Sequence, residues 1–149
     1  MSLKLKRILL AEDNPQDVEM TLDALSSHGL ANAIDVVNDG VEALDFLFRR
    51  GAFASREEGN PGLLLLDIKM PRLDGLQVLE QIKQIDHLRT IPVVMLTASR
   101  QERDLMESYR LGVNAFVVKP VEFQQFADAM KVLGLFWALL NEPPPEARA

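Results

Sequence analysis

The stretch LLLLDIKMPRLDG, residues 63–75, decides the fold class of this 149-residue chain. Its first four residues are apolar without alternation, which is typical of a central parallel strand buried on both faces. Asp67 ends this apolar run, and Asp74-Gly75 precede apolar residues at helical spacing. The stretch therefore predicts a buried strand, an acidic residue at its carboxyl end and a helix beyond a short loop.

The same order of strand, loop and helix extends on both sides of this stretch. Asp39 with Glu42 and Ser99 with Glu102 have the spacing of N-terminal capping boxes. Residues 51–62 contain turn-forming residues without periodicity, and we predict a connecting loop there. The predicted strands are 6–11, 33–37, 63–67, 91–97 and 115–118, and the predicted helices are 14–28, 39–50, one starting at 74, 99–111 and 122–140.

This alternation predicts an α/β fold with a doubly wound parallel sheet, (βα)5. Short connections and right-handed crossovers leave few strand orders, and 2-1-3-4-5 is the best candidate. The prediction is thus a flavodoxin-like three-layer sandwich, in which ligands bind beyond the carboxyl ends of the strands.

Composition limits the classes of function. The 16 Lys and Arg against 22 Asp and Glu give a formal charge of −6, the wrong sign for neutralising the phosphates of a nucleic acid. The absence of cysteine excludes disulfides, a thiol nucleophile and Cys-ligated zinc. The apolar stretch VLGLFWALL at 132–140 has nine residues, whereas about 20 are needed to span a bilayer. We expect no nucleic acid or membrane partner and a cytoplasmic location.

Polar residues follow four of the predicted strands and should converge at one edge of the sheet. They are Glu12 and Asp13 after the first strand, Asp67 after the third, Thr97 after the fourth and Lys119 after the fifth. Neighbouring strands lie about 4.8 Å apart, so the three carboxylates should repel one another and raise one another's pKa. Carboxylate oxygens without His or Cys suit Mg²⁺, which relieves this repulsion. A carboxylate beside Mg²⁺, an ammonium and a hydroxyl can accept a phosphoryl group as a nucleophile.

Four segments that carry these residues resemble the response regulator receiver domain of two-component signalling. They are LLAEDN at 9–14, LLLLDIKMPRLDG at 63–75, VVMLTAS at 93–99 and AFVVKP at 115–120, and the resemblance extends from residue 6 to about 140. It implies that a histidine kinase donates a phosphoryl group to Asp67. It also implies a phospho-accepting signalling domain that promotes only its own phosphorylation and dephosphorylation, not an enzyme.

The resemblance implies a role for each residue of the cleft. Asp13 and Asp67 would bind Mg²⁺ directly, Glu12 would act mainly through water, and the backbone carbonyl of Lys69 would be a further ligand. Thr97 and Lys119 would bind the phosphoryl oxygens. Phe116 would be the aromatic residue whose inward or outward rotamer reports the state of the site.

More narrowly, the chain resembles the phytochrome-associated single-domain response regulators. The features are the 51–62 loop, the long apolar last helix and the lack of an output domain. This implies a red-light-regulated histidine kinase as the donor, although other histidine kinases could serve. We expect a single receiver domain with an extended last helix at 1–142 and a proline-rich tail at 143–149, signalling through contacts with an unknown downstream protein.

The predicted last helix carries two apolar stripes. The first contains Phe126, Met130, Leu133, Trp137 and Leu140, and the second contains Val132, Leu135, Phe136 and Leu139. Because the sheet can bury only one stripe, we predict that the second forms a homodimer or partner surface. The alternative is that the proline-rich tail or the 51–62 loop folds over it.

Two other functions fit part of the pattern. A Mg²⁺-dependent phosphohydrolase of the haloacid dehalogenase type also uses an Asp nucleophile after a parallel strand. That class has a second acidic residue two positions after the nucleophile, where this chain has Lys69. Enzymes of that class also have a cap domain for substrate selection, which we do not expect in this chain. A non-phosphorylated adaptor would keep the fold without the switch. Neither G-x-x-x-x-G-K-[ST] nor G-x-G-x-x-G occurs, so nucleotide binding has no support.

Overall fold

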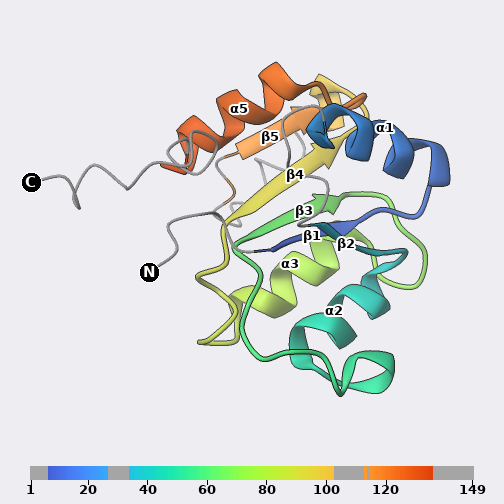
Figure 1. Ribbon diagram of the computed structural model, residues 1–149, viewed down its shortest axis with the longest axis vertical. Helices are drawn as coiled ribbons and strands as arrows, with labels where there is room; N and C mark the ends of the chain where they lie inside the picture. Colours follow the sequence, from blue (N-terminus) through green and yellow to red (C-terminus); the bar gives the residue numbers. More distant parts are fainter. Residues whose placement is uncertain (1–6, 27–33, 103–112, 114, 136–149) are drawn as a thin grey trace, which may run out of the picture.

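Five parallel strands form one sheet in the order β2-β1-β3-β4-β5 (Figure 1). The computed structural model describes residues 7–26, 34–102, 113 and 115–135. The strands are β1 Ile8–Ala11, β2 Ile34–Val37, β3 Leu63–Asp67, β4 Val93–Thr97 and β5 Ala115–Val118. This order confirms the predicted doubly wound sheet. β4 begins two residues later than predicted, because Pro92 has no N–H to give to the ladder.

The described helices follow the predicted alternation. They are α1 Pro15–Ser26, α2 Gly40–Phe48, α3 Gly75–Lys83 and α5 Phe123–Val132, with a short 3₁₀ helix, η2, at Gly51–Phe53. Asp39 and Asp74 cap α2 and α3, and each side chain accepts from the backbone N–H three residues further on. Residues 100–102 form a helical turn after β4. The predicted ends of the helices at 14–28 and 99–111 lie outside the described residues.

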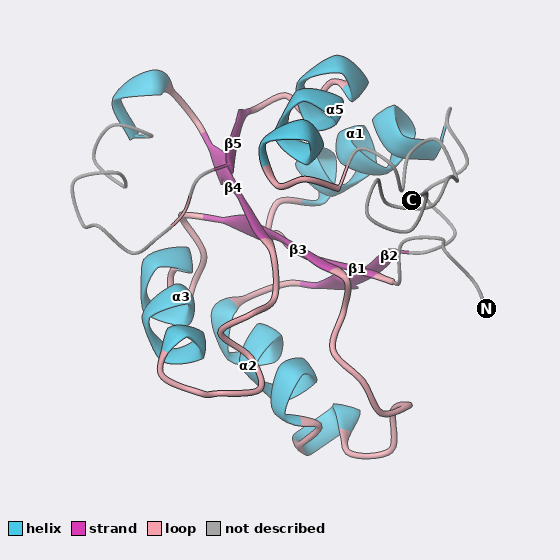
Figure 2. Ribbon diagram, turned by 90° about the vertical axis from the view of Figure 1, so that its left-hand side faces the viewer, coloured by secondary structure: helices cyan, strands magenta, loops and turns pink. Residues whose placement is uncertain are grey.

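The helices cover both faces of the sheet, as the three-layer prediction requires. Figure 2 shows α1 and α5 on one side and α2 and α3 on the other. Leu9 and Leu64 pack with α2 and α3, whereas Ile8 and Leu63 pack in the cluster that contains the buried residues of α1 and α5. All four side chains are buried, which explains why these strands are apolar without alternation.

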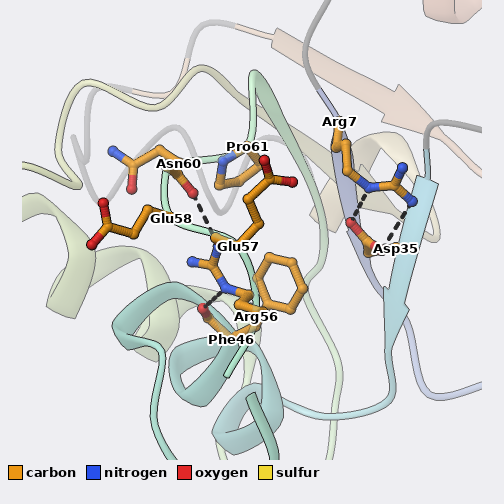
Figure 3. A pocket seen from close by; sticks show the side chains of 9 residues that line it. Arg7, Asp35, Phe46, Arg56, Glu57, Glu58, Asn60 and Pro61 are labelled. Carbon is orange, nitrogen blue, oxygen red and sulfur yellow. Dashed lines mark hydrogen bonds and ion pairs between the residues drawn. The ribbon is translucent and has the colours of Figure 1, made fainter. Parts of the chain in front are cut away.

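The 51–62 loop packs against α2 and contains η2, so it is more ordered than the sequence predicts. The Arg56 Nε donates to the backbone carbonyl of Phe46 at 2.6 Å, and its guanidinium lies 4.3 Å from the centre of the Phe46 ring (Figure 3). The loop is on the α2 face, opposite to α5 (Figure 1). The alternative in which this loop covers the last helix is therefore wrong.

The prediction of a last helix that continues to residue 140 is also wrong, because α5 ends at Val132. Gly134 has a φ of 73°, which a glycine adopts without strain. The Gly134 N–H donates to the Lys131 carbonyl at 3.0 Å, and the Leu135 N–H donates to the Met130 carbonyl at 2.8 Å. These two bonds are the Schellman pattern that terminates a helix.

This helix end changes the predicted second stripe. Val132 is 61% exposed, but Leu135 lies beyond the helix and packs against the core cluster on the α5 side. Phe136 and Leu139 lie outside the described residues. Val132 and Leu135 are therefore not neighbours on one exposed helix face.

In the ranges that the structure describes, no helix combines the length and the apolar content that crossing a membrane requires.

Candidate functional site

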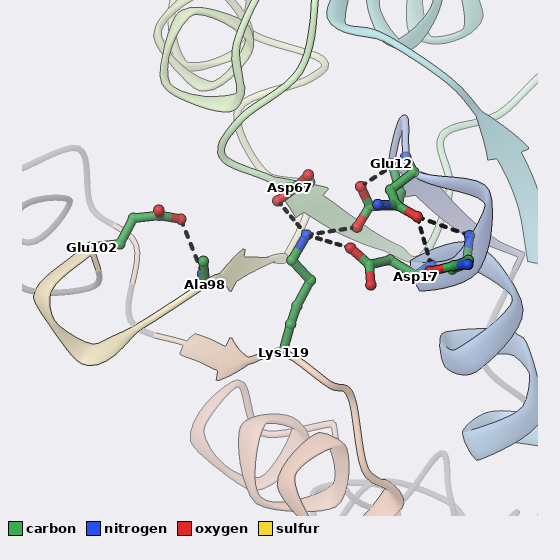
Figure 4. A network of polar contacts seen from close by, with 8 residues as sticks. Glu12, Asp17, Asp67, Ala98, Glu102 and Lys119 are labelled. Atoms are coloured by element: carbon green, nitrogen blue, oxygen red, sulfur yellow. Dashed lines mark hydrogen bonds and ion pairs between the residues drawn. The ribbon is translucent and has the colours of Figure 1, made fainter.

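The carboxyl ends of four strands bring the predicted polar residues to one edge of the sheet (Figure 4). β1 lies directly beside β3, so Glu12 and Asp13 emerge next to Asp67, the last residue of β3. β4 continues the sheet and ends with Thr97, and β5 ends one residue before Lys119. The predicted convergence of these residues is confirmed by the sheet order.

Three carboxylates form a cluster at this edge. Glu12, Asp13 and Asp67 each offer one oxygen, and these oxygens lie within 4.8 Å of one another. Glu12 is fully buried, Asp67 is 3% exposed and Asp13 is exposed. Two of the three carboxyl groups are therefore held away from water, and the third lies where the cluster opens to solvent.

Lys119 is the cation that faces this cluster. Its Nζ lies 3.0 Å from Glu12 Oε1, 3.0 Å from Asp17 Oδ2 and 3.2 Å from Asp67 Oδ1. The Lys119 backbone N–H donates to the Thr97 carbonyl at 2.8 Å, which fixes the base of the side chain at the end of β4. One ammonium thus joins α1, β1 and β3 to the segment after β5.

The electrostatics of the cleft are unbalanced without a further cation. Glu12, Asp13, Asp17 and Asp67 supply four carboxylates against the single ammonium of Lys119. Burial, followed by the neighbouring Glu12, raises the pKa of Asp67 to about 8. Burial alone would lower the pKa of Lys119, but its bonds to Glu12 and Asp17 raise it above its ordinary value. The ammonium stays charged, and a divalent cation would let Asp67 ionise.

The donor set of the cleft fits Mg²⁺ and a phosphoryl group. The clustered carboxylate oxygens are hard ligands, and among the described residues no His or Cys joins the cluster. The Thr97 side chain is fully buried, and its Oγ1 has no hydrogen-bond partner among the described residues. A buried hydroxyl without a partner costs free energy, so Thr97 is suited to donate to an oxygen that arrives with a ligand.

Two further predicted residues are Lys69, in the loop after β3, and Phe116, in β5. The Lys69 side chain is 82% exposed, and its Nζ lies 3.7 Å from Glu102 Oε2. The predicted role of its backbone carbonyl as a metal ligand stays a prediction. Phe116 is half-buried and packs against the core cluster on the α2 and α3 side. Its predicted change of rotamer also stays a prediction.

Comparison with known proteins identifies the family. The family model described as "Response regulator receiver domain" matches residues 8–131. The chain is a response regulator receiver domain. Receiver domains are signalling domains, not a catalytic enzyme family, so the phosphohydrolase alternative has no support.

This receiver is similar to response regulators that are named as bacteriophytochrome response regulators. The structure of the bacteriophytochrome response regulator AtBRR is 60% identical, with a TM-score of 0.87, and the match covers 93% of this chain and 99% of that chain. RtBRR, also a bacteriophytochrome response regulator, is 57% identical with a TM-score of 0.86, covering 97% and 87%. Response regulator Rcp1 of Synechocystis sp. is 34% identical, covering 89% of this chain and 88% of its own. The resemblance to phytochrome-associated single-domain response regulators is thereby confirmed.

Related receivers have been solved with ligands that match the chemistry of this cleft. Rcp1 has been solved in a Mn²⁺-bound form, 34% identical with a TM-score of 0.68, covering 89% of this chain and 92% of that chain. The cyanobacterial phytochrome response regulator RcpA has been solved phosphorylated, 35% identical with a TM-score of 0.70, covering 91% and 94%.

Sequence reasoning missed Asp17 and the second role of Glu102. Asp17 is in the first turn of α1, where an acid is expected from the helix dipole alone, so nothing marked it as a partner of Lys119. Glu102 was predicted as a capping residue, and its N–H does donate to Ser99 Oγ at 3.2 Å. Its carboxylate also accepts from the Ala98 N–H at 3.1 Å, beside the cleft (Figure 4).

Proposed function

We propose that this receiver accepts a phosphoryl group from a histidine kinase on Asp67 in a Mg²⁺-dependent reaction. The observation that carries the proposal is the acid cluster at the end of β3, which contacts Lys119, together with the buried Thr97 hydroxyl at the end of the adjacent β4, which has no hydrogen-bond partner among the described residues. Metal-binding carboxylates, an ammonium and a hydroxyl are the groups that phosphoryl transfer to a carboxylate needs. A structural acid that only capped a turn would need none of them.

Each residue has a defined task in this transfer. An oxygen of Asp67 attacks the phosphorus, and the bond from phosphorus to the donor's imidazole nitrogen breaks as the new oxygen–phosphorus bond forms. Mg²⁺, held by Glu12, Asp13, Asp67 and the Lys69 carbonyl, would neutralise the carboxylates and the phosphoryl oxygens. Lys119 and Thr97 donate to the phosphoryl oxygens, which orients the group and stabilises its charge.

Labelling by a small phosphodonor tests this proposal. In the presence of Mg²⁺ we expect the chain to incorporate one acid-labile phosphoryl group from phosphoramidate, and Asp67→Asn to incorporate none. A matched control is Asp86→Asn, since the Asp86 side chain is 94% exposed and distant in sequence from the cleft. A wild-type chain that stays unlabelled in Mg²⁺ would instead favour the non-phosphorylated adaptor.

We also propose a phytochrome-type histidine kinase as the donor and the cytoplasm as the place of transfer. The similarity to AtBRR and RtBRR supports the choice of kinase. The output is a changed contact with a downstream protein, because phosphorylation of Asp67 biases the arrangement of Thr97 and Phe116. Phosphotransfer from a purified phytochrome-type kinase, compared with an unrelated histidine kinase, tests the choice of donor.

A homodimer through the last helix also remains part of the proposal. Val132 is the exposed apolar residue of α5 that supports it, at 61% exposure. Sedimentation with and without beryllofluoride should show a dimer that Val132→Glu weakens. Lys131→Glu is the matched control for an added acidic charge on the same helix. A chain that sediments as a monomer at high concentration in both states contradicts a dimer.

A further inference from the structure

The Glu102 carboxylate bridges two groups that flank the acceptor. Its Oε1 accepts from the Ala98 N–H at 3.1 Å, and its Oε2 lies 3.7 Å from Lys69 Nζ. The Glu102 side chain is only 12% exposed, so this carboxylate is turned inward from the helical turn at 100–102. Figure 4 shows it beside the end of β4, on the side of the cleft away from Asp17.

Both partners of Glu102 belong to segments that lead directly from the site. Ala98 immediately follows Thr97, and Lys69 is the second residue after Asp67. A backbone N–H and an ammonium that converge on one carboxylate form a position suited to an anion. In the unmodified chain that position is filled by the protein's own Glu102.

Resting on the proposed function, we propose that Glu102 is a positioning residue that competes with the phosphoryl group for the Ala98 N–H and the Lys69 ammonium. A phosphoryl group on Asp67 carries about −1.5 to −2 charges and oxygens that need donors. Glu102 opposes it in two ways, because its charge repels the incoming anion and its carboxylate occupies the Ala98 N–H and pairs with the Lys69 ammonium. Phosphorylation therefore releases Glu102, and the strength of its contacts sets how readily the site accepts an anion.

Beryllofluoride affinity measures this competition without a covalent step. We would titrate beryllofluoride by calorimetry in saturating Mg²⁺ with the wild-type chain and Glu102→Gln. Glutamine keeps an oxygen that can accept from the Ala98 N–H but lacks the charge. We expect it to bind beryllofluoride roughly fivefold more tightly, with a smaller difference at high ionic strength. Glu80→Gln, an exposed acid on α3, is the matched control and should bind as the wild-type chain does.

A second variant separates competition from simple helix capping. Lys69→Met leaves the competing carboxylate in place and removes the ammonium, so its beryllofluoride affinity should fall. A Glu102 that only caps its helix would change thermal stability on substitution and leave beryllofluoride affinity unchanged.

The inference is overturned if folded Glu102→Gln binds beryllofluoride no more tightly than the wild-type chain, or if Lys69→Met binds it more tightly. A wild-type chain that binds no beryllofluoride in Mg²⁺ would overturn the proposed function, and this inference with it. If the wild-type chain binds beryllofluoride and Glu102→Gln binds it with the same affinity, only the proposed role of Glu102 is overturned.

Discussion

Replacing Asp67 with Asn should stabilise the folded chain when no divalent cation is present. The Asp67 residue is 3% exposed, and burial followed by the neighbouring Glu12 raises its pKa from 3.8 to about 8. The unfolded chain releases this proton near pH 4, whereas the folded chain holds it to about pH 8. The folded state therefore loses stability as the pH rises through this window, and a neutral side chain avoids that loss.

The size of the effect follows from the pKa. Each pKa unit corresponds to about 1.4 kcal/mol, so the roughly three units between the unfolded pKa and pH 7 set an upper bound of about 4 kcal/mol. Lys119 remains paired with Glu12 and Asp17 in the variant, so no buried cation is left alone. Because the cluster opens to solvent at the exposed Asp13, we expect the cost in the wild-type chain to be smaller than this bound. We expect Asp67→Asn to raise the free energy of unfolding by about 2–3 kcal/mol at pH 7, and by about two fifths as much at pH 5.

Urea denaturation followed by circular dichroism in EDTA measures this difference. The control Asp86→Asn removes a carboxylate whose side chain is 94% exposed, and should change the free energy of unfolding by less than about 0.5 kcal/mol. Adding Mg²⁺ should stabilise the wild-type chain more than the variant and narrow the gap, because the cation binds only the folded cluster. The reasoning is wrong if Asp67→Asn is no more stable than the wild-type chain at pH 7 in EDTA.

Three further predictions concern the other residues of the cleft. Lys119→Met leaves the buried carboxylates without their cation, and should lower the free energy of unfolding in EDTA by about 2 kcal/mol, measured by the same denaturation. Thr97→Val removes a buried hydroxyl that has no described partner, and should change the free energy of unfolding by less than about 1 kcal/mol while shortening the phosphoryl lifetime measured by loss of label. Gly75→Ala places a Cβ against the Asp67 carbonyl oxygen, and should lower the melting temperature and slow labelling together, with about 2 kcal/mol of destabilisation.

The sheet and its polar edge could be predicted because each strand ends at a clear change in residue type. The apolar run of β3 stops at Asp67, and the bounds of β3 and β5 match the prediction. Parallel strands with helices between them place all carboxyl ends at one edge, so the convergence of Glu12, Thr97 and Lys119 followed from order alone.

The contacts that depend on side-chain direction could not be predicted. Asp17 and Lys119 are 102 residues apart in the sequence, so only the fold brings them into contact. An acidic residue in the first turn of a helix is already explained by the helix dipole. The end of α5 had a signal in Gly134, but the apolar residues after it continued the helical period and masked the stop. The 51–62 segment lacks periodicity, and its order comes from contacts with other parts of the chain, such as the Arg56 guanidinium on Phe46 and the Gly62 N–H on the Arg7 carbonyl.

Localising the phosphoryl group tests the central claim most directly. The chain is incubated with phosphoramidate and Mg²⁺, the acyl phosphate is trapped by borohydride reduction, and the modified peptide is sequenced by mass spectrometry. The account predicts a single modified residue, Asp67, whose labelling disappears in EDTA. Modification at another residue, or labelling of Asp67 that is equally strong without Mg²⁺, would contradict it.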